Sequence, residues 1–109
     1  MSKEEVLAEY DIDLKQFEND KDGSFVNQAL LTRTKRLILK DRLGVVEALR
    51  YWLSLRADGL TMTAVDLIGY VNIPELKPDL ECLKKEIESG KTFLPDYNYW
   101  VDRSLKSIK

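Results

Sequence analysis

Basic side chains are concentrated between residues 33 and 42. Arg33, Arg36 and Lys40 recur at spacings of three and four residues, which place side chains on one face of a helix. Lys35 and Arg42 extend the cluster. Cationic groups grouped in this way can bind RNA, acidic peptides or anionic lipid headgroups. The segment is therefore a candidate surface for binding a partner or an anion.

The same basic segment has a second interpretation, as a solvated helix face. Residues 32–56 carry seven Lys and Arg against two acidic residues, a net charge of +5, whereas residues 1–22 carry three lysines against eight acidic residues, a net charge of −5. The acidic stretch could lie against the basic one, through contacts that are weak where they are exposed to solvent and salt. We favour this interpretation, because runs of charge usually lie on solvated surfaces.

Aromatic residues gather in the segment FLPDYNYW, residues 93–100. Tyr97 and Trp100 share a helical stripe with Val101 and could face the core, whereas Phe93 and Tyr99 do not fit on that stripe. Exposed Tyr and Trp are typical of protein interfaces. Core packing is the favoured interpretation, and a protein interface made by these four rings is the alternative.

Most kinds of catalytic site are absent from the sequence. There is no histidine, so the commonest general base and metal ligand are missing, together with any Ser-His or Cys-His nucleophile pair. The five glycines form neither a phosphate-binding loop nor a dinucleotide fingerprint. We interpret paired carboxylates such as Asp11 and Asp13 as solvated helix surface. We expect no enzymatic activity, no catalytic residue, no metal and no cofactor.

Length and composition are typical of one soluble globular domain over residues 1–109. The chain is 44% hydrophobic and 33% charged, and residues 1–22 are expected to form an acidic N-terminal helical arm. No apolar run approaches the roughly 20 residues of a membrane span, and the first residues resemble no targeting peptide. We expect a cytoplasmic protein with no membrane association. Cys82 is expected to be a small core or boundary residue.

Apolar residues at helical spacing, combined with capping residues, predict helices along nearly the whole chain. Ser2 and Glu5 form a capping-box pattern, and Trp52 is predicted to be buried with Tyr51 facing outward. The predicted helix starts are Ser2, Ser24, Asp41, Thr63 with Asp66, Pro74 or Pro78, and Asp96. The predicted ends include Lys40, Gly59, Val71 and Gly90.

The stretch TAVDLIGYVNIPELKPDLECLKKEI, residues 63–87, could be a helix-turn-helix that reads DNA or a helical hairpin that stacks on its neighbours. The segment that would have to read the bases, from Pro74 to Gly90, has five acidic residues against three lysines and no Arg, Asn or Gln to pair with bases. A net-acidic helix opposes the phosphate contacts that dominate DNA affinity. A winged-helix protein would therefore have to use the basic 33–42 segment, with strands at 91–101 as its wing.

Two halves of the C-terminal region repeat each other weakly. An offset of 37 residues places Ala64 on Val101 and Ile68 on Leu105. The same offset places Val46 on Leu83. Both helices of a pair then match, which favours stacked helical hairpins.

The segment AVDLIGYVNIPELKPDLECL resembles HEAT-type helical repeats. Ile68-Gly69 stands for the Leu-Gly pair that ends one helix, and a proline-started helix with spaced leucines follows. In the next expected helix, YNYWVDRSLKSI, Asp102 stands where the family prefers arginine, and Arg103 lies one place late. The repeat period of 37 residues is also shorter than usual. The resemblance covers residues 43–108. It implies a helical repeat, whose family members usually act as binding scaffolds, and it transfers no site residue.

The sequence thus predicts an all-α fold of five or six helices in stacked antiparallel hairpins, a short solenoid-like bundle. The expected function is a non-catalytic protein-interaction or adaptor module, with a protein partner or self-association. A winged-helix-like nucleic-acid-binding protein is the alternative.

Overall fold

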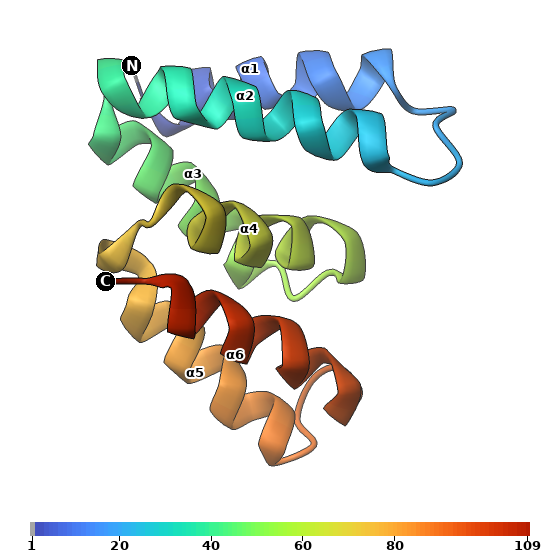
Figure 1. The fold of residues 1–109 in the computed structure, drawn as a ribbon, viewed down its shortest axis with the longest axis vertical. Coiled ribbons are helices and arrows are strands. Elements are labelled where there is room, and N and C mark those ends of the chain that lie inside the picture. The colour runs from blue at the N-terminus through green and yellow to red at the C-terminus, as the bar shows by residue number, and fades with distance from the viewer. Residues whose placement is uncertain (1) are drawn as a thin grey trace. The chain divides into compact units, whose positions relative to one another are not determined.

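The computed structural model describes residues 2–109 and contains six α-helices, with no β-strand in that range (Figure 1). The all-α prediction is therefore confirmed. Two short 3-10 turns precede the last two helices: η1 (Pro74–Leu76) and η2 (Pro95–Tyr97). The helices are α1 (Lys3–Gln16), α2 (Ser24–Lys40), α3 (Arg42–Ser54), α4 (Asp58–Val71), α5 (Lys77–Glu88) and α6 (Asn98–Ser107).

The chain forms two compact units, and the boundary between them lies inside α3. The first unit ends at Ala48, and the second runs from Leu49 to Lys109.

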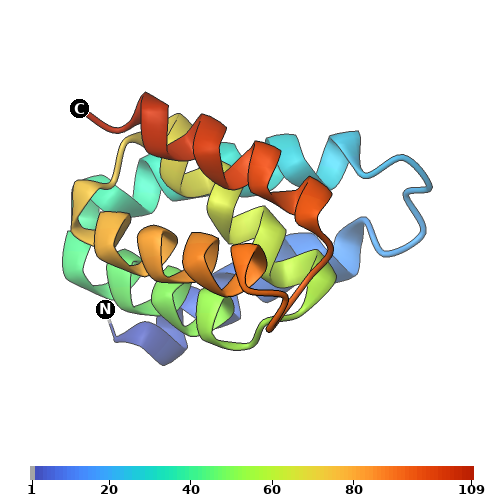
Figure 2. The ribbon, with the colours of Figure 1, turned by 90° about the horizontal axis from the view of Figure 1, so that it is seen from below.

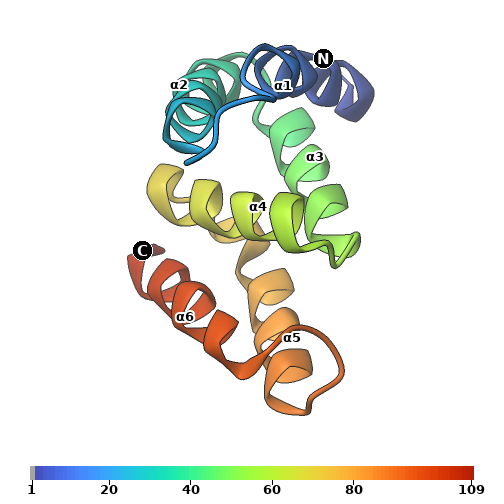
Figure 3. The same ribbon diagram turned by 90° about the vertical axis from the view of Figure 1, so that its right-hand side faces the viewer.

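In the first unit, α1 and α2 lie side by side and run antiparallel (Figures 1 and 3). The predicted capping box starts α1: the Glu5 N–H donates to Ser2 Oγ over 3.2 Å, and the Ser2 N–H donates to Glu5 Oε1 over 3.1 Å. Val6, Tyr10, Leu30 and Leu37 are buried in this unit. The acidic stretch is thus a helix packed on its neighbour.

A hydrogen-bond chain crosses the contact between α1 and α2. The hydroxyl of Thr34 donates to the carbonyl of Leu30 over 2.7 Å, so its oxygen is left to accept the Tyr10 hydroxyl, also at 2.7 Å. Burial raises the pKa of Tyr10 to about 12. The two helices are therefore joined by a polar contact within an apolar core.

The start of α2 differs from the prediction that Ser24 caps it. Ser24 is the first residue of the helix, after Gly23 with φ 73°. Asp22 Oδ1 accepts both the N–H and the hydroxyl of Ser24 at 2.9 Å, and Asp20 Oδ2 accepts the Phe25 N–H at 3.0 Å. Ser24 is a donor here because the Asp22 carboxylate accepts its hydroxyl hydrogen. At the other end, α2 reaches Lys40 as predicted.

In the second unit, α6 lies beside both α4 and α5 (Figure 2). Trp52 is 3% exposed and Tyr51 is 42% exposed, which confirms both predictions. The other buried apolar side chains of this unit are Leu49, Leu53, Ala64, Val65, Leu67, Ile68, Ile73, Leu76, Leu80, Leu83, Ile87 and Val101.

The predicted boundary between α3 and α4 is wrong. Helix α3 ends at Ser54 rather than at Gly59, and α4 begins at Asp58 rather than at Thr63. Thr61 explains the early start of α4, because its hydroxyl accepts the Ala57 N–H at 2.8 Å and donates to the Trp52 carbonyl at 2.8 Å.

The predicted start and end of α5 are confirmed, whereas the predictions for Asp96 and Cys82 are wrong. Helix α5 contains Pro78 in its first turn, and Gly90, with φ 77°, follows its end as expected. Asp96 does not cap α6, because Pro95 starts a 3-10 turn that leads directly into a helix beginning at Asn98. The prediction that Cys82 is a core or boundary residue is wrong: it is exposed, because the buried face of α5 contains Leu80, Leu83 and Ile87.

Candidate functional site

The basic segment is partly neutralised within its own unit. Arg33 makes a two-point contact with Asp13, from Nε to Oδ2 at 2.7 Å and from Nη2 to Oδ1 at 3.1 Å. Its Nη1 also contacts Glu9 Oε1 at 2.8 Å, and Arg36 Nη2 reaches the same oxygen at 3.4 Å. Asp13 and Glu9 raise the pKa of Arg33. The expected contact between the acidic arm and the basic segment is present.

The other three candidate basic residues lie on the surface. Lys35 and Lys40 are exposed on α2, and Arg42 is exposed at the start of α3. Arg33 faces α1 and its side chain is only 16% exposed, whereas that of Arg36 is 56% exposed. The five residues therefore do not form one continuous cationic face, since Arg33 has turned inward to its carboxylate partners.

Aromatic and apolar side chains at the start of α6 form an exposed group, which we term the aromatic surface: Phe93, Leu94, Tyr97, Tyr99 and Trp100. Leu94 is 68% exposed, Tyr99 64% and Trp100 39%, whereas Phe93 and Tyr97 are half-buried. Core packing, the favoured interpretation, therefore does not account for Tyr99 and Trp100, which are exposed.

The rings of the aromatic surface contact one another in series. Phe93 meets Tyr97 edge-on at 5.2 Å between ring centroids, Tyr97 lies 6.5 Å from Trp100, and Trp100 meets Tyr99 edge-on at 5.2 Å. Such geometries are favourable for aromatic pairs. The four rings are thus packed against one another.

The backbone and a neighbouring cation hold this surface in place. Phe93 has φ 56°, a left-handed conformation that is unusual for a bulky residue. The guanidinium of Arg103 lies 5.9 Å from the centre of the Tyr99 ring, within the range of a cation–π contact. Val101, fully buried, anchors the same turn of α6 in the core.

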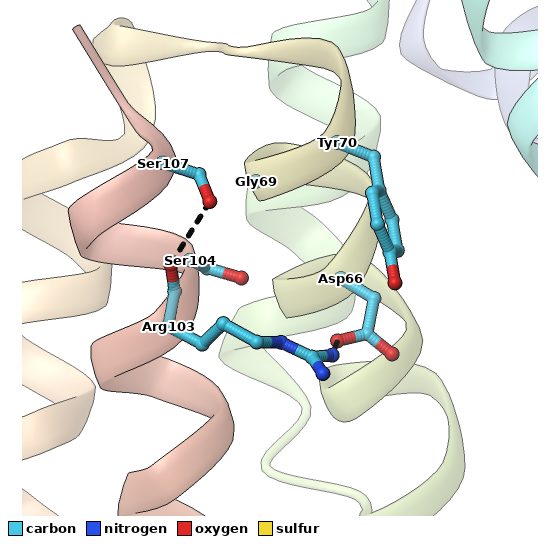
Figure 4. A pocket seen from close by; sticks show the side chains of 6 residues that line it. All are labelled: Asp66, Gly69, Tyr70, Arg103, Ser104 and Ser107. Carbon is cyan, nitrogen blue, oxygen red and sulfur yellow. Dashed lines mark hydrogen bonds and ion pairs between the residues drawn. The ribbon is translucent and has the colours of Figure 1, made fainter.

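A small cleft between α4 and α6 was not anticipated from the sequence. It has a volume of about 90 Å³ and is lined by Asp66, Gly69, Tyr70, Arg103, Ser104 and Ser107 (Figure 4). Arg103 Nη2 contacts Asp66 Oδ1 at 3.2 Å, and the Ser107 hydroxyl donates to the Arg103 carbonyl over 3.0 Å. Burial raises the pKa of Asp66, and Arg103 partly offsets this effect.

The cleft is better explained by helix packing than by ligand binding. Its volume holds about three water molecules. Its central hydroxyl, Ser104 Oγ, donates to the Val65 carbonyl over 2.7 Å and so joins α6 to α4. Gly69 allows this approach, since a Cβ there would lie 3.0 Å from the Ser104 Cα.

Ion pairs also join α5 to its neighbours. Arg50 Nε contacts both carboxylate oxygens of Asp79 at 3.3 Å. Arg56 contacts Glu86 through Nε to Oε1 at 3.0 Å and Nη2 to Oε2 at 2.9 Å. Arg56 lowers the pKa of Glu86 to about 2. These charged groups serve internal contacts between helices.

No helix within residues 2–109 combines the length and the apolar character needed to cross a membrane. Over the same residues, Cys, Asp and Glu side chains form no group of three that could hold a metal ion. No protein-family model matches the chain, and no curated protein or solved structure gives a significant match.

Proposed function

We propose that the chain is a non-catalytic protein-interaction or adaptor module, and that the aromatic surface is where a partner binds. The observation that carries this proposal is that Tyr99 and Trp100 are 64% and 39% exposed and meet edge-on, with Leu94, 68% exposed, a few residues earlier in the chain. Tyr, Trp and Arg are the residues most enriched in interface hot spots. Arg103, whose guanidinium lies 5.9 Å from the centre of the Tyr99 ring, adds an arginine to the same surface.

The mutual packing of the rings in this surface also favours binding. Side chains that are already packed against one another lose less conformational freedom when a partner docks. Single exposed hydrophobic residues are common on protein surfaces, whereas grouped ones mark interaction sites. Tyr70 provides a contrast, since it is equally exposed, at 64%, and belongs to no ring contact described above.

A helical-repeat scaffold of the HEAT-like kind is the architecture we propose for this role. Ion pairs support it, because they join helices that correspond to each other at the 37-residue offset. Arg50 and Arg56 join the end of α3 to α5, and Asp66 and Arg103 join α4 to α6. Asp66 and Arg103 are 37 residues apart, which equals the offset found in the sequence. We propose a cytoplasmic location, because the single cysteine requires no oxidising compartment.

The nucleic-acid alternative has less support. Residues 91–101 contain η2 and the start of α6, so the strands of a wing are not formed there. Arg33 and Arg36 contact carboxylates of α1, which reduces the charge available to phosphates. No observation favours this second function over the first.

The proposal is tested by affinity capture from an extract of the source organism, with and without nuclease. The immobilised proteins are the unchanged chain, the double variant Leu94→Ser/Tyr99→Ala and the control Tyr70→Ala. Circular dichroism and thermal melting establish that all three are folded. We expect a defined protein that survives nuclease, is lost with the double variant and is retained by the control.

Two results would contradict the proposal. Retention of the same proteins by the double variant would show that the aromatic surface is not the binding site. Loss of every retained protein after nuclease treatment would point instead to nucleic acid and the exposed basic residues.

A further inference from the structure

A stripe of partly exposed side chains runs along α2, and we term it the α2 stripe. Phe25 is 62% exposed, Leu39 87%, and the side chain of Arg36 56%. Thr32 is also exposed, and Ala29 is half-buried. These positions recur at alternating spacings of four and three residues, which keeps them in line along one helix.

The stripe borders a hollow at its N-terminal half. Phe17, which follows α1, stacks on Phe25 with ring centroids 6.4 Å apart, and both rings line a cavity of about 390 Å³ together with Gln28, Ala29 and Thr32. The small side chains in the middle would let another helix approach closely. A rise of about 1.5 Å per residue puts Phe25 and Leu39 about 21 Å apart, enough to seat several turns of a helix.

The charges beside the stripe differ in sign at its two ends. Residues 18–22, beside Phe25, contain three acidic residues and one lysine, a net charge of −2. Residues 35–42, beside Leu39, contain Lys35, Lys40 and Arg42 against Asp41, a net charge of +2, besides Arg36, whose charge is partly offset by Glu9. Backbone and hydroxyl hydrogen bonds from Ser24 lower the pKa of Asp22.

We propose that two copies of the chain associate by packing their α2 stripes antiparallel, about a two-fold axis at Thr32. Thr32 lies midway between Phe25 and Leu39, so the axis pairs each Phe25 with the other copy's Leu39. The acidic end of each copy then meets the basic end of its partner. A parallel arrangement would instead bring like charges together.

Such an interface is isologous, because both copies use the same patch. It is independent of the aromatic surface, which belongs to the second unit. The expected dimer is weak, since one helix stripe covers less area than a standard protein interface.

Disulfide formation tests the geometry of the dimer. Cys82→Ser removes the native thiol, and Thr32→Cys or Gln28→Cys is then introduced at an exposed position of α2. Two copies of residue 32 meet at the axis, whereas two copies of residue 28 are offset by about 12 Å along the helix, beyond the reach of a disulfide. We expect rapid oxidation to a covalent dimer with Thr32→Cys and at least about tenfold slower oxidation with Gln28→Cys.

Equal oxidation rates for the two variants would overturn the antiparallel arrangement, and so would the absence of a covalent Thr32→Cys dimer. Sedimentation equilibrium of the unchanged chain tests association itself. A purely monomeric chain at concentrations up to about 1 mM, the weak end of protein affinities, would also overturn the proposal.

Charge variants test the pairing of the two ends. Lys35→Glu/Lys40→Glu makes both ends acidic and should abolish association. Glu18→Lys/Asn19→Lys makes both ends basic and should do the same, whereas mixing the two variants should restore association as a heterodimer. Failure of the mixture to associate, while both variants are folded, would contradict the charge complementarity.

Discussion

Arg33 and Arg36 show that the environment of a single side chain decides what a basic residue does. The spacing of the two residues placed them on one helix face, and both lie on α2. The sequence did not determine which carboxylates would oppose them, since Glu9 and Asp13 lie on another helix. The net charges of residues 1–22 and 32–56 did predict that these acidic and basic segments would meet, because net charges of opposite sign attract.

The contact of Glu86 with Arg56 predicts a pH dependence of stability. The pKa of Glu86 in the folded chain is about 2, below the value of about 4.3 for an unfolded glutamate, so the unfolded chain binds more protons between these values. The stabilisation is therefore complete above about pH 5 and is lost as the pH falls towards 2.

The variant Glu86→Gln should reduce the free energy of unfolding by about 1 kcal/mol at pH 7, as expected for a partly exposed ion pair. Urea unfolding at a series of pH values should show this difference shrinking between about pH 5 and pH 2. Glu88→Gln, an exposed residue on the same helix, serves as the control. A difference that stays constant over this pH range would contradict the role assigned to the ion pair.

At the scale of elements, local patterns predicted helices well and their ends less well. The capping box of Ser2 and Glu5 involves only two residues three positions apart, and it forms as predicted. Thr63 failed as a helix start because Thr61 makes a hydrogen bond to the Trp52 carbonyl, nine residues away. Contacts of this kind depend on how neighbouring helices pack, which the spacing of residues within one helix does not reveal.

Gly69 sets how closely α4 and α6 approach. A Cβ at this position would lie 2.6 Å from Ser104 Oγ and 3.0 Å from Ser104 Cα, and a backbone atom cannot move aside as a flexible side chain can. We expect Gly69→Ala to lower the free energy of unfolding by about 1–3 kcal/mol, as overpacking does. Chemical denaturation measures the change.

Gly59→Ala is the matched control for this variant. A Cβ there meets no atom within 4 Å, and Gly59 lies in the same helix. It should leave stability unchanged or raise it by up to about 1 kcal/mol, through the lower entropy of the unfolded chain. If both variants have the same stability, the close approach at Gly69 does not constrain the packing of the helices.

At the scale of the whole molecule, the all-α class was predictable because apolar periodicity and capping residues agree along most of the chain. The exposure of the aromatic surface was only partly predictable. Tyr99 did not fit the buried stripe and is exposed, but Trp100 did fit it and is 39% exposed. A left-handed residue, Phe93, and a 3-10 turn, Pro95–Tyr97, precede α6, and residue spacing within the helix does not reveal them.

The most direct test of the proposed function is a calorimetric titration of the captured protein with three forms of the chain. These are the unchanged chain, Tyr99→Ala and Tyr70→Ala, two substitutions of equally exposed tyrosines. A hot-spot residue contributes about 2 kcal/mol, so Tyr99→Ala should weaken binding by at least about tenfold. Tyr70→Ala should leave the affinity within about twofold of that of the unchanged chain. Equal affinities for all three forms would contradict the assignment of the aromatic surface as the binding site.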